Sequence, residues 1–189
     1  KGANQALAAR RLGAEVALAG RVGADAMADE ALALLRAGGV DLSACSVDEA
    51  AATGVALIAV SEDGENQIIV ASGANATLTP DRLVLPAADA IICQLEIPME
   101  TVLAASRAPG FFCVNLAPAA AVPDELFARA DLIVVNEGEA AFQGARLKTA
   151  KGLVAITEGA KGAALFRNGA EIARAAPPAV TAVDTTGAG

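Results

Sequence analysis

The stretch Leu132–Gln143, LIVVNEGEAAFQ, contains the pattern that decides the fold of this chain. Residues 132–135 are apolar and rich in branched side chains, which predicts a buried strand. Residues 137–143 follow with good helix formers and predict a helix that begins directly after the strand. A strand that is apolar throughout and leads into a helix is typical of a parallel sheet covered on both faces.

The same alternation of strand and helix extends to both sides of this stretch. Before it, Thr79-Pro80-Asp81 is typical of a capped helix start with Pro at the first helical position. Further elements are expected as strands over 90–95, 111–116 and 153–157 and helices over 99–107 and 123–129. After them, strands over 163–167 and 170–174 flank Asn168-Gly169, which predicts a hairpin near the sheet edge.

The first 75 residues predict two helices and a second hairpin. The expected elements are helices over 3–12 and 25–36, a strand over 15–20, and strands over 53–60 and 66–71 that flank a turn at 62–65. We therefore predict an α/β fold, with an open, mostly parallel sheet and helices on both faces. Its core would comprise residues 1–44 and 76–189, and residues 45–75 would form a small β lid.

Composition excludes several classes of partner. The chain has 189 residues, a net charge of -8 and 3% aromatic residues, with no Trp or Tyr, which argues against a nucleic-acid partner. No apolar stretch approaches the length of a membrane span, and no signal peptide appears. Three Cys residues, at 45, 93 and 113, stand far apart and fit reduced thiols. We expect a cytoplasmic protein that acts on neither nucleic acid nor membrane.

The chain contains no His, so acid–base chemistry would fall to Asp, Glu, Lys or Cys. Neither the P-loop motif nor the dinucleotide-binding glycine motif occurs. If the protein handles phosphate, it does so with another arrangement of backbone N–H groups.

Polar residues follow three of the predicted strands, at 94–96, 136–139 and 157–159. A single Glu in such a place is more often a partner of a helix dipole or a solvated loop residue. Three successive strand ends, however, meet at one edge of a parallel sheet, where ligands bind in this class of fold. The pattern favours a site there.

The stretch AVDTTGAG, Ala182–Gly189, ends an apolar run with an Asp, two hydroxyls and small residues. Small residues let backbone N–H groups converge on an anion at the start of a helix. The alternative is a glycine-rich turn capped by Thr.

Together these segments resemble the ribokinase (PfkB-type) family of carbohydrate kinases. AVDTTGAG resembles the family's second signature, and KGANQALAARRLGA, residues 1–14, resembles its first signature without the two glycines that normally precede it. Between them, five blocks follow the ribose-phosphorylating members in order: TGVALIAVSEDGENQIIVASGANATL, QLEIPMETV, NLAPA, DLIVVNEGEA and ITEGAKGA. The resemblance covers essentially the whole chain and implies a ribokinase-like fold.

The resemblance implies transfer of the ATP γ-phosphoryl group to the 5-hydroxyl of D-ribose, which yields ribose 5-phosphate. In the family the second signature continues with a catalytic Asp, expected here just after Gly189, and an opening strand with a sugar-binding Asp precedes the first signature. We therefore expect this chain to be part of a longer protein. By itself it would be inactive and prone to aggregate.

The resemblance also implies which residues contact the sugar: Lys1, Gly2, Ala3, Asn4 and Glu96. Asn4 would hydrogen-bond the sugar hydroxyls and Glu96 would accept from them. The alternative for Asn4 is a plain helix N-cap.

For the nucleotide, the resemblance implies ATP contacts from Asn136, Thr157, Gly159, Lys161 and Gly162. Glu139 would hold Mg²⁺ indirectly, Asp184 and Thr186 would bind a monovalent cation, K⁺, and Gly187, Ala188 and Gly189 would form the anion hole. Alternatives are a solvated first helical turn for Glu137 and Glu139, a solvated side chain for Lys161, and capping by Asp184 and Thr186.

Two other functions stay open. The protein could be a kinase of the same family that acts on another sugar, such as deoxyribose or fructose. It could also be a non-catalytic module that binds a sugar or a nucleotide. In the catalytic case, the lid would exclude water and pair between subunits, which implies a homodimer.

Overall fold

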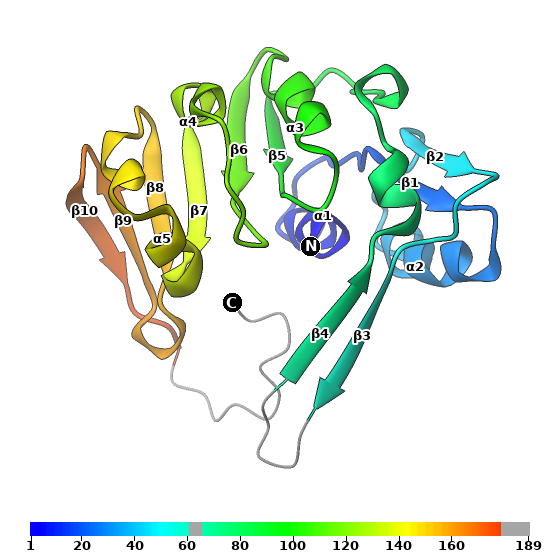
Figure 1. The fold of residues 1–189 in the computed structure, drawn as a ribbon, viewed down its shortest axis with the longest axis horizontal. Coiled ribbons are helices and arrows are strands. Elements are labelled where there is room, and N and C mark those ends of the chain that lie inside the picture. Colours follow the sequence, from blue (N-terminus) through cyan, green and yellow to red (C-terminus); the bar gives the residue numbers. More distant parts are fainter. Residues whose placement is uncertain (61–65, 179–189) are drawn as a thin grey trace. The chain divides into compact units, whose positions relative to one another are not determined.

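The computed structural model describes residues 1–60 and 66–178 (Figure 1). The chain divides into two compact units, each described here by itself. The first comprises Lys1–Ala87 with Glu96–Thr101, and the second comprises Ala88–Leu95 with the residues from Val102 onward. No helix within the described ranges is long and apolar enough to cross a membrane.

The second unit is built on a six-stranded sheet in the order β10-β9-β8-β7-β6-β5. Its strands are β5 (Ala90–Cys93), β6 (Phe111–Asn115), β7 (Leu132–Asn136), β8 (Leu153–Thr157), β9 (Ala163–Arg167) and β10 (Ala170–Ala175). Strands β5 to β8 run parallel, β9 is antiparallel to β8, and β10 is antiparallel to β9. The mostly parallel sheet is confirmed, and the predicted hairpin lies at its edge.

Three helices belong to this strand–helix alternation: α3 (Met99–Ser106), α4 (Asp124–Arg129) and α5 (Glu137–Gln143). Helix α5 begins where β7 ends and packs against β7 and β8. Two short 3₁₀ helices, Gly144–Thr149 and Gly159–Lys161, complete the connections to β8 and β9. The helix predicted from LIVVNEGEAAFQ therefore has the expected bounds.

The core of the second unit is formed by apolar side chains from the central strands. Phe112 of β6 and Ile133 of β7 are fully buried. The guanidinium of Arg129 lies over the Phe112 ring, 5.4 Å from its centre. The cysteines of this unit, Cys93 and Cys113, are buried free thiols, in agreement with the sequence prediction.

The first unit contains two small sheets. Its elements are α1 (Gly2–Arg11), β1 (Gly20–Gly23), α2 (Ala26–Ala37), β2 (Cys45–Asp48), β3 (Val55–Val60), β4 (Asn66–Ala71) and the 3₁₀ turns Gly73–Thr77 and Pro80–Arg82. Strands β1 and β2 pair in parallel, whereas β3 and β4 form the predicted antiparallel hairpin. The predicted turn at 62–65 lies outside the described residues.

The strand predicted over 15–20 is wrong. Ala17 makes only an isolated bridge with Asp41, and the ladder begins at Gly20, opposite Cys45. Residues 15–19 do not form a strand, because the segment opposite them becomes extended only from Cys45 onward. Regular pairing therefore starts at Gly20, where the predicted strand was expected to end. The helix expected after Thr79 is a single 3₁₀ turn, which ends where Leu83 becomes extended. Strand β2 lies within the predicted 45–75 lid but pairs with β1, and the extent of the lid stays a prediction.

Two carboxylates form hydrogen bonds that connect the base of the β3–β4 hairpin to the rest of the first unit. Asp25 caps α2 through the N–H of Ala28 at 3.0 Å and also accepts from the backbone N–H and the hydroxyl of Thr53, both at 2.7 Å. Thr53 lies two residues before β3 begins. The N-terminus of α2 is thus tied directly to one arm of the hairpin.

The second carboxylate, Asp48 at the end of β2, is buried. It accepts hydrogen bonds from the Thr77 hydroxyl, the Ala50 backbone N–H and the Arg21 Nε, the last at 2.9 Å. These hydrogen bonds hold the pKa of Asp48 well below its ordinary value, and the bond from Thr77 has the largest effect. Because Thr77 follows β4 and Arg21 lies in β1, Asp48 connects the other arm of the hairpin to the β1–β2 pair.

We predict that Asp48→Asn makes the full-length protein less stable at neutral pH and flattens the acid side of its stability profile. A lowered native pKa stabilises the fold above the unfolded-state pKa, near 3.8, and this contribution disappears as the pH falls toward the native value. Thermal unfolding at pH 7, 5, 4 and 3 measures the difference in stability between the wild type and Asp48→Asn. It should be constant down to about pH 5 and shrink below about pH 4. A difference that grows on acidification would contradict the assignment.

A second prediction concerns the core. Ile133→Ala should lower the free energy of unfolding by about 2–5 kcal/mol, because it opens a cavity at a fully buried position of β7. Ile172→Ala, at a half-exposed position of β10, is the matched control and should cost much less. Urea unfolding of the two variants measures both values, and equal losses would show that β7 is not central.

Candidate functional site

The carboxyl ends of the parallel strands bring together side chains predicted to bind the nucleotide. Asn136 is the last residue of β7 and Thr157 is the last residue of β8, and the two are paired in register. Gln94 directly follows β5. Asn115, the last residue of β6, lies at the same edge of the sheet and donates to the Val134 carbonyl at 3.0 Å. The sequence did not single out Asn115, although it too follows an apolar run.

Asn136 and Glu139 form a reciprocal capping box at the start of α5. The Glu139 backbone N–H donates to Asn136 Oδ1 at 2.8 Å, and the Asn136 backbone N–H donates to Glu139 Oε2 at 2.9 Å. Glu139 is only 8% exposed. The alternative of a solvated side chain is therefore wrong for Glu139. Its neighbour Glu137 does fit that description, because it is exposed.

The Lys161 side chain links the start of α5 to the turn that follows β8. Its Nζ donates to Glu137 Oε1 at 3.1 Å, and both side chains are largely exposed. An exposed pair of this kind contributes little to stability. It does place the Lys161 side chain on the α5 side of the turn.

The turn over 158–162 closes on itself through backbone hydrogen bonds. The Glu158 N–H donates to the Gly162 carbonyl at 2.7 Å, and the Gly162 N–H donates to the Gly159 carbonyl at 3.0 Å. Gly159 and Gly162 both have positive φ, +53° and +92°. A Cβ on Gly162 would lie 1.9 Å from the carbonyl oxygen of Ala175, whereas a Cβ on Gly159 would meet open space. The glycine at 162 is thus required by close packing as well as by its φ.

In the first unit, the structure brings Glu96 to the start of α1. The terminal amino group of Lys1, the N-cap residue, donates to Glu96 Oε2 at 2.7 Å, and the Glu96 side chain is 37% exposed. A carboxylate at this end of a helix is stabilised by the helix dipole. Gly2 and Ala3 form the first turn of α1.

Asn4 occupies the third helical position, and its side chain is exposed. Because Lys1 is the capping residue and no side chain caps α1, the alternative that Asn4 is the N-cap is wrong. The five residues predicted for the sugar therefore lie in one unit, and at least Lys1 and Glu96 are in contact.

The remaining predicted site residues lie outside the described residues: Asp184, Thr186, Gly187, Ala188 and Gly189. Their roles as cation ligands and anion hole stay predictions. Within the described ranges, no group of three or more His, Cys, Asp or Glu side chains is arranged to hold a metal ion.

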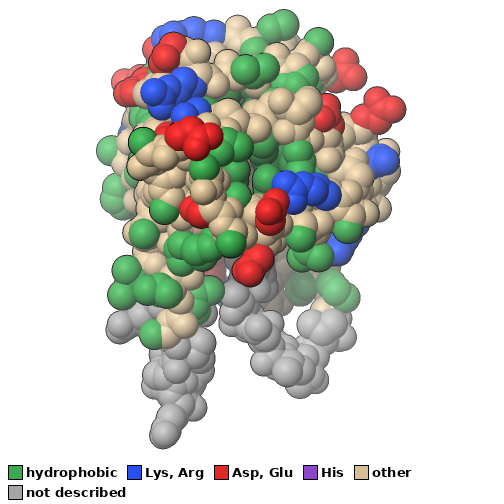
Figure 2. Space-filling model, turned by 90° about the vertical axis from the view of Figure 1, so that its right-hand side faces the viewer, with side chains coloured by type: hydrophobic (Ala, Val, Ile, Leu, Met, Phe, Trp, Pro, Cys, Tyr) green, Lys and Arg blue, Asp and Glu red, His purple; other side chains and the backbone are tan. Residues whose placement is uncertain are grey.

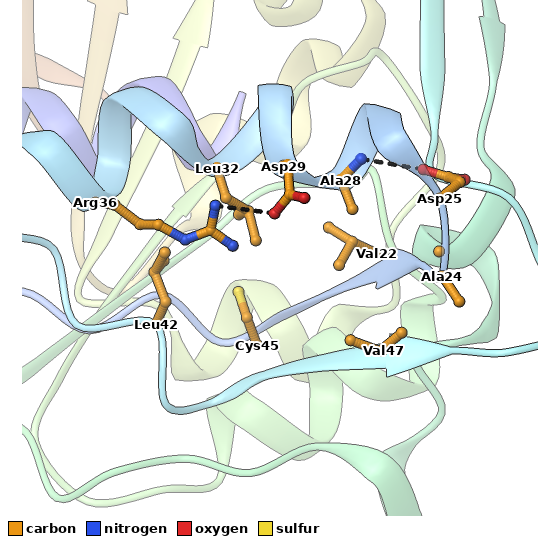
Figure 3. Close-up of a pocket in the computed structure, with 11 residues that line it drawn as sticks. Val22, Ala24, Asp25, Ala28, Asp29, Leu32, Arg36, Leu42, Cys45 and Val47 are labelled. Atoms are coloured by element: carbon orange, nitrogen blue, oxygen red, sulfur yellow. Dashed lines mark hydrogen bonds and ion pairs between the residues drawn. The ribbon is translucent and has the colours of Figure 1, made fainter.

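A cavity of about 340 Å³ lies between α2 and the β1–β2 pair in the first unit (Figure 3). Apolar side chains such as Val22 and Leu32 line it, and Arg36 pairs with Asp29 at 3.2 Å on its helical side. None of the residues predicted to bind a ligand lines this cavity. On the face shown in Figure 2, hydrophobic side chains reach the surface between charged ones.

The model of the pfkB family carbohydrate kinases matches residues 1–189. The chain belongs to this family. It is 38% identical over 149 residues to the ribokinase of Staphylococcus aureus (strain COL). This alignment covers 74% of this chain and 49% of that protein. It is 36% identical over 214 aligned positions to the ribokinase of Haemophilus influenzae, with all of this chain and 69% of that protein covered.

A solved structure from the family is also similar. The structure of Arabidopsis thaliana ribokinase complexed with ribose and ATP superimposes with a TM-score of 0.83 at 27% identity, covering 99% of this chain and 69% of that one. The chain thus spans about half to two thirds of the length of these family members. The family resemblance predicted from the two signatures and the ribokinase-like α/β fold are confirmed.

We predict that the two glycines of the 158–162 turn respond differently to substitution. Gly162→Ala should lower the free energy of unfolding by about 2 kcal/mol or more, because backbone strain adds to the clash with Ala175. Gly159→Ala, the matched control, carries the strain of a positive φ alone, about 1 kcal/mol. Chemical denaturation of the full-length variants measures both values. Equal effects would mean that the approach of Gly162 to β10 is not maintained in solution.

Proposed function

We propose that the protein to which this chain belongs transfers the γ-phosphoryl group of ATP to the 5-hydroxyl of ribose. The observation that carries this proposal is the match to the pfkB family carbohydrate kinases over the whole chain. The similarity to ribokinases, one of them solved with ribose and ATP, supports ribose as the sugar and ATP as the donor.

The proposed sugar site consists of Lys1, Gly2, Ala3, Asn4 and Glu96. Glu96 is partly exposed and, when ionised, only accepts hydrogen bonds, so it suits a sugar hydroxyl. The exposed Asn4 amide both donates and accepts. A site built to bond hydroxyl groups discriminates strongly against analogues that lack them.

The proposed ATP site consists of Asn136, Thr157, Gly159, Lys161 and Gly162. Support comes from the register that pairs Asn136 with Thr157 and from the glycines of the 158–162 turn. Lys161 supplies positive charge, and among the described residues its exposed ammonium pairs with the exposed Glu137 alone. A phosphate group could therefore compete for Lys161 without exposing a buried charge.

Mg²⁺ and K⁺ are proposed as cofactors. Glu139 fits an indirect role in Mg²⁺ binding, because it is buried and one carboxylate oxygen already accepts from Asn136. Mg²⁺ keeps several waters and binds few carboxylates, which suits such a ligand. When bound, it would neutralise charge on the phosphates. Asp184 and Thr186 are the proposed K⁺ ligands.

In the proposed reaction, Gly187, Ala188 and Gly189 donate backbone N–H groups to the charge that develops on the phosphoryl group. The Asp that continues the family's second signature would accept the proton of the sugar hydroxyl. In-line transfer needs little else from the protein than positioning and charge stabilisation.

The hairpin β3–β4 is proposed as a lid and as the contact of a cytoplasmic homodimer. It extends from the rest of the first unit (Figure 1), and its strands expose apolar side chains, among them Leu57 and Ile69. Apolar surface of this kind favours burial against a sugar site or a second subunit.

The function is tested with the protein expressed from its complete reading frame. Ribose, 2-deoxyribose and fructose are supplied singly and in competition, and ADP and sugar phosphate are measured. Ribose 5-phosphate should form only with ATP, and ribose should have the highest kcat/KM. Preference for another sugar would indicate a different kinase of the family, and ATP binding without turnover would indicate a binding module.

We predict that Glu96→Gln raises the KM for ribose by roughly tenfold or more, because a charged acceptor of the sugar hydroxyls is lost. The KM for ATP should change little. Glu100→Gln, an exposed position in the first turn of α3, is the matched control and should leave both constants unchanged. If the two variants gave the same KM for ribose, Glu96 would have no part in sugar binding.

A further inference from the structure

Arg174 of β10 binds two carboxylates at once. Its Nε and Nη2 donate to the two oxygens of Glu171, both at 2.9 Å, and its Nη1 donates to Glu158. The two parallel bonds to Glu171 fix the plane of the guanidinium. Glu171 therefore orients Arg174 toward Glu158, which lies in another part of the unit.

An irregularity in β10 makes this arrangement possible. In a regular strand, residues three apart point to opposite faces, so Glu171 and Arg174 would not meet. Between Glu171 and Ala173 the register with β9 shifts by one residue. The extra residue returns Arg174 to the face of Glu171. Bulges of this kind redirect side chains and occur often beside functional sites.

Glu158 opens the turn over 158–162, and its backbone carries the bonds that close it. Its N–H donates to the Gly162 carbonyl, and its own carbonyl accepts from the Lys161 N–H at 3.0 Å. The Glu158 side chain is only 19% exposed, less than half the exposure of its partner Arg174. Whatever holds Glu158 in place therefore also holds the backbone of the turn in place.

β10 holds this turn at a second point. Gly162 packs so closely on the carbonyl of Ala175, the residue after Arg174, that no side chain fits between them. On the other side of the turn, Lys161 reaches Glu137 of α5. The turn therefore contacts α5 on one side and β10 on the other, and Arg174 is the cation on the β10 side.

We infer that Arg174, oriented by Glu171, is a positioning residue for nucleotide binding: it holds Glu158 and with it the 158–162 turn in the form that receives ATP. The inference rests on the proposed function, which makes this turn part of the ATP site. Arg174 also neutralises two carboxylates beside the turn. Without it, their negative charge would oppose the phosphates of the nucleotide.

A surface ion pair without such a role would contribute little and would leave nucleotide affinity unchanged. The test is therefore made on affinity. Isothermal titration calorimetry with ATP on the full-length protein gives a Kd that does not depend on turnover. Arg174→Met keeps the aliphatic part of the side chain, and we expect it to weaken ATP binding by about tenfold. The KM for the sugar should stay the same.

Three variants complete the test. Arg167→Met removes an exposed Arg from the neighbouring strand β9 and is the matched control, with an ATP Kd equal to that of the wild type. Glu158→Gln combined with Arg174→Met should recover part of the lost affinity, because one unpaired carboxylate is removed. Arg174→Lys keeps the charge but loses the paired bonds, and its Kd should be intermediate.

An unchanged ATP Kd in Arg174→Met would overturn the inference while the kinase function stands. A parallel rise in the ATP Kd and the sugar KM, without recovery in the double variant, would also overturn it, because general loss of structure would explain the result. If the wild type binds ATP but phosphorylates no sugar, the proposed function fails and the ATP Kd still decides the role of Arg174. If the wild type binds no ATP, both fail.

Discussion

The parallel pairing of β5, β6, β7 and β8 is the constraint on which the candidate nucleotide site depends. Parallel strands all end at the same edge of a sheet, so residues far apart in the sequence become neighbours once the register is set. Here the register pairs Asn136 with Thr157 and leads directly into α5 on one side and the 158–162 turn on the other. A shift of one residue in the pairing of β7 with β8 would separate them and turn their side chains to the other face.

Residues at the carboxyl edge of the parallel strands have structural roles as well as the proposed chemical ones. Asn136 and Glu139 complete the capping of α5, and Gly162 allows the turn to approach β10. A substitution there would therefore change stability and ligand binding together, and a loss of activity alone would not identify a catalytic role. The controls at Gly159, Glu100 and Arg167 separate the two effects, because each makes the same chemical change at a position that lacks the contact in question.

Local patterns in the sequence predict much of this fold. The bounds of α5, β4, β8 and β9 follow from apolar periodicity and turn residues, because each is set by its own segment. β1 could not be placed in this way, since its limits depend on where the distant segment from Cys45 becomes extended. The Arg174 contacts were equally out of reach, because the register shift in β10 that creates them depends on pairing with β9. The capping of α5 by Asn136 and Glu139 was not predicted, and the burial of Glu139 also required the packed structure.

The central claim is that this chain contributes a ribose site around Glu96 and Asn4 and an ATP site around the 158–162 turn. A crystal structure of the full-length protein with ribose and a non-hydrolysable ATP analogue tests it most directly. The account predicts ribose hydroxyls within hydrogen-bond distance of the Glu96 carboxylate and nucleotide density against Thr157 and Gly162. Ribose bound away from α1, or a nucleotide that does not touch the 158–162 turn, would contradict it.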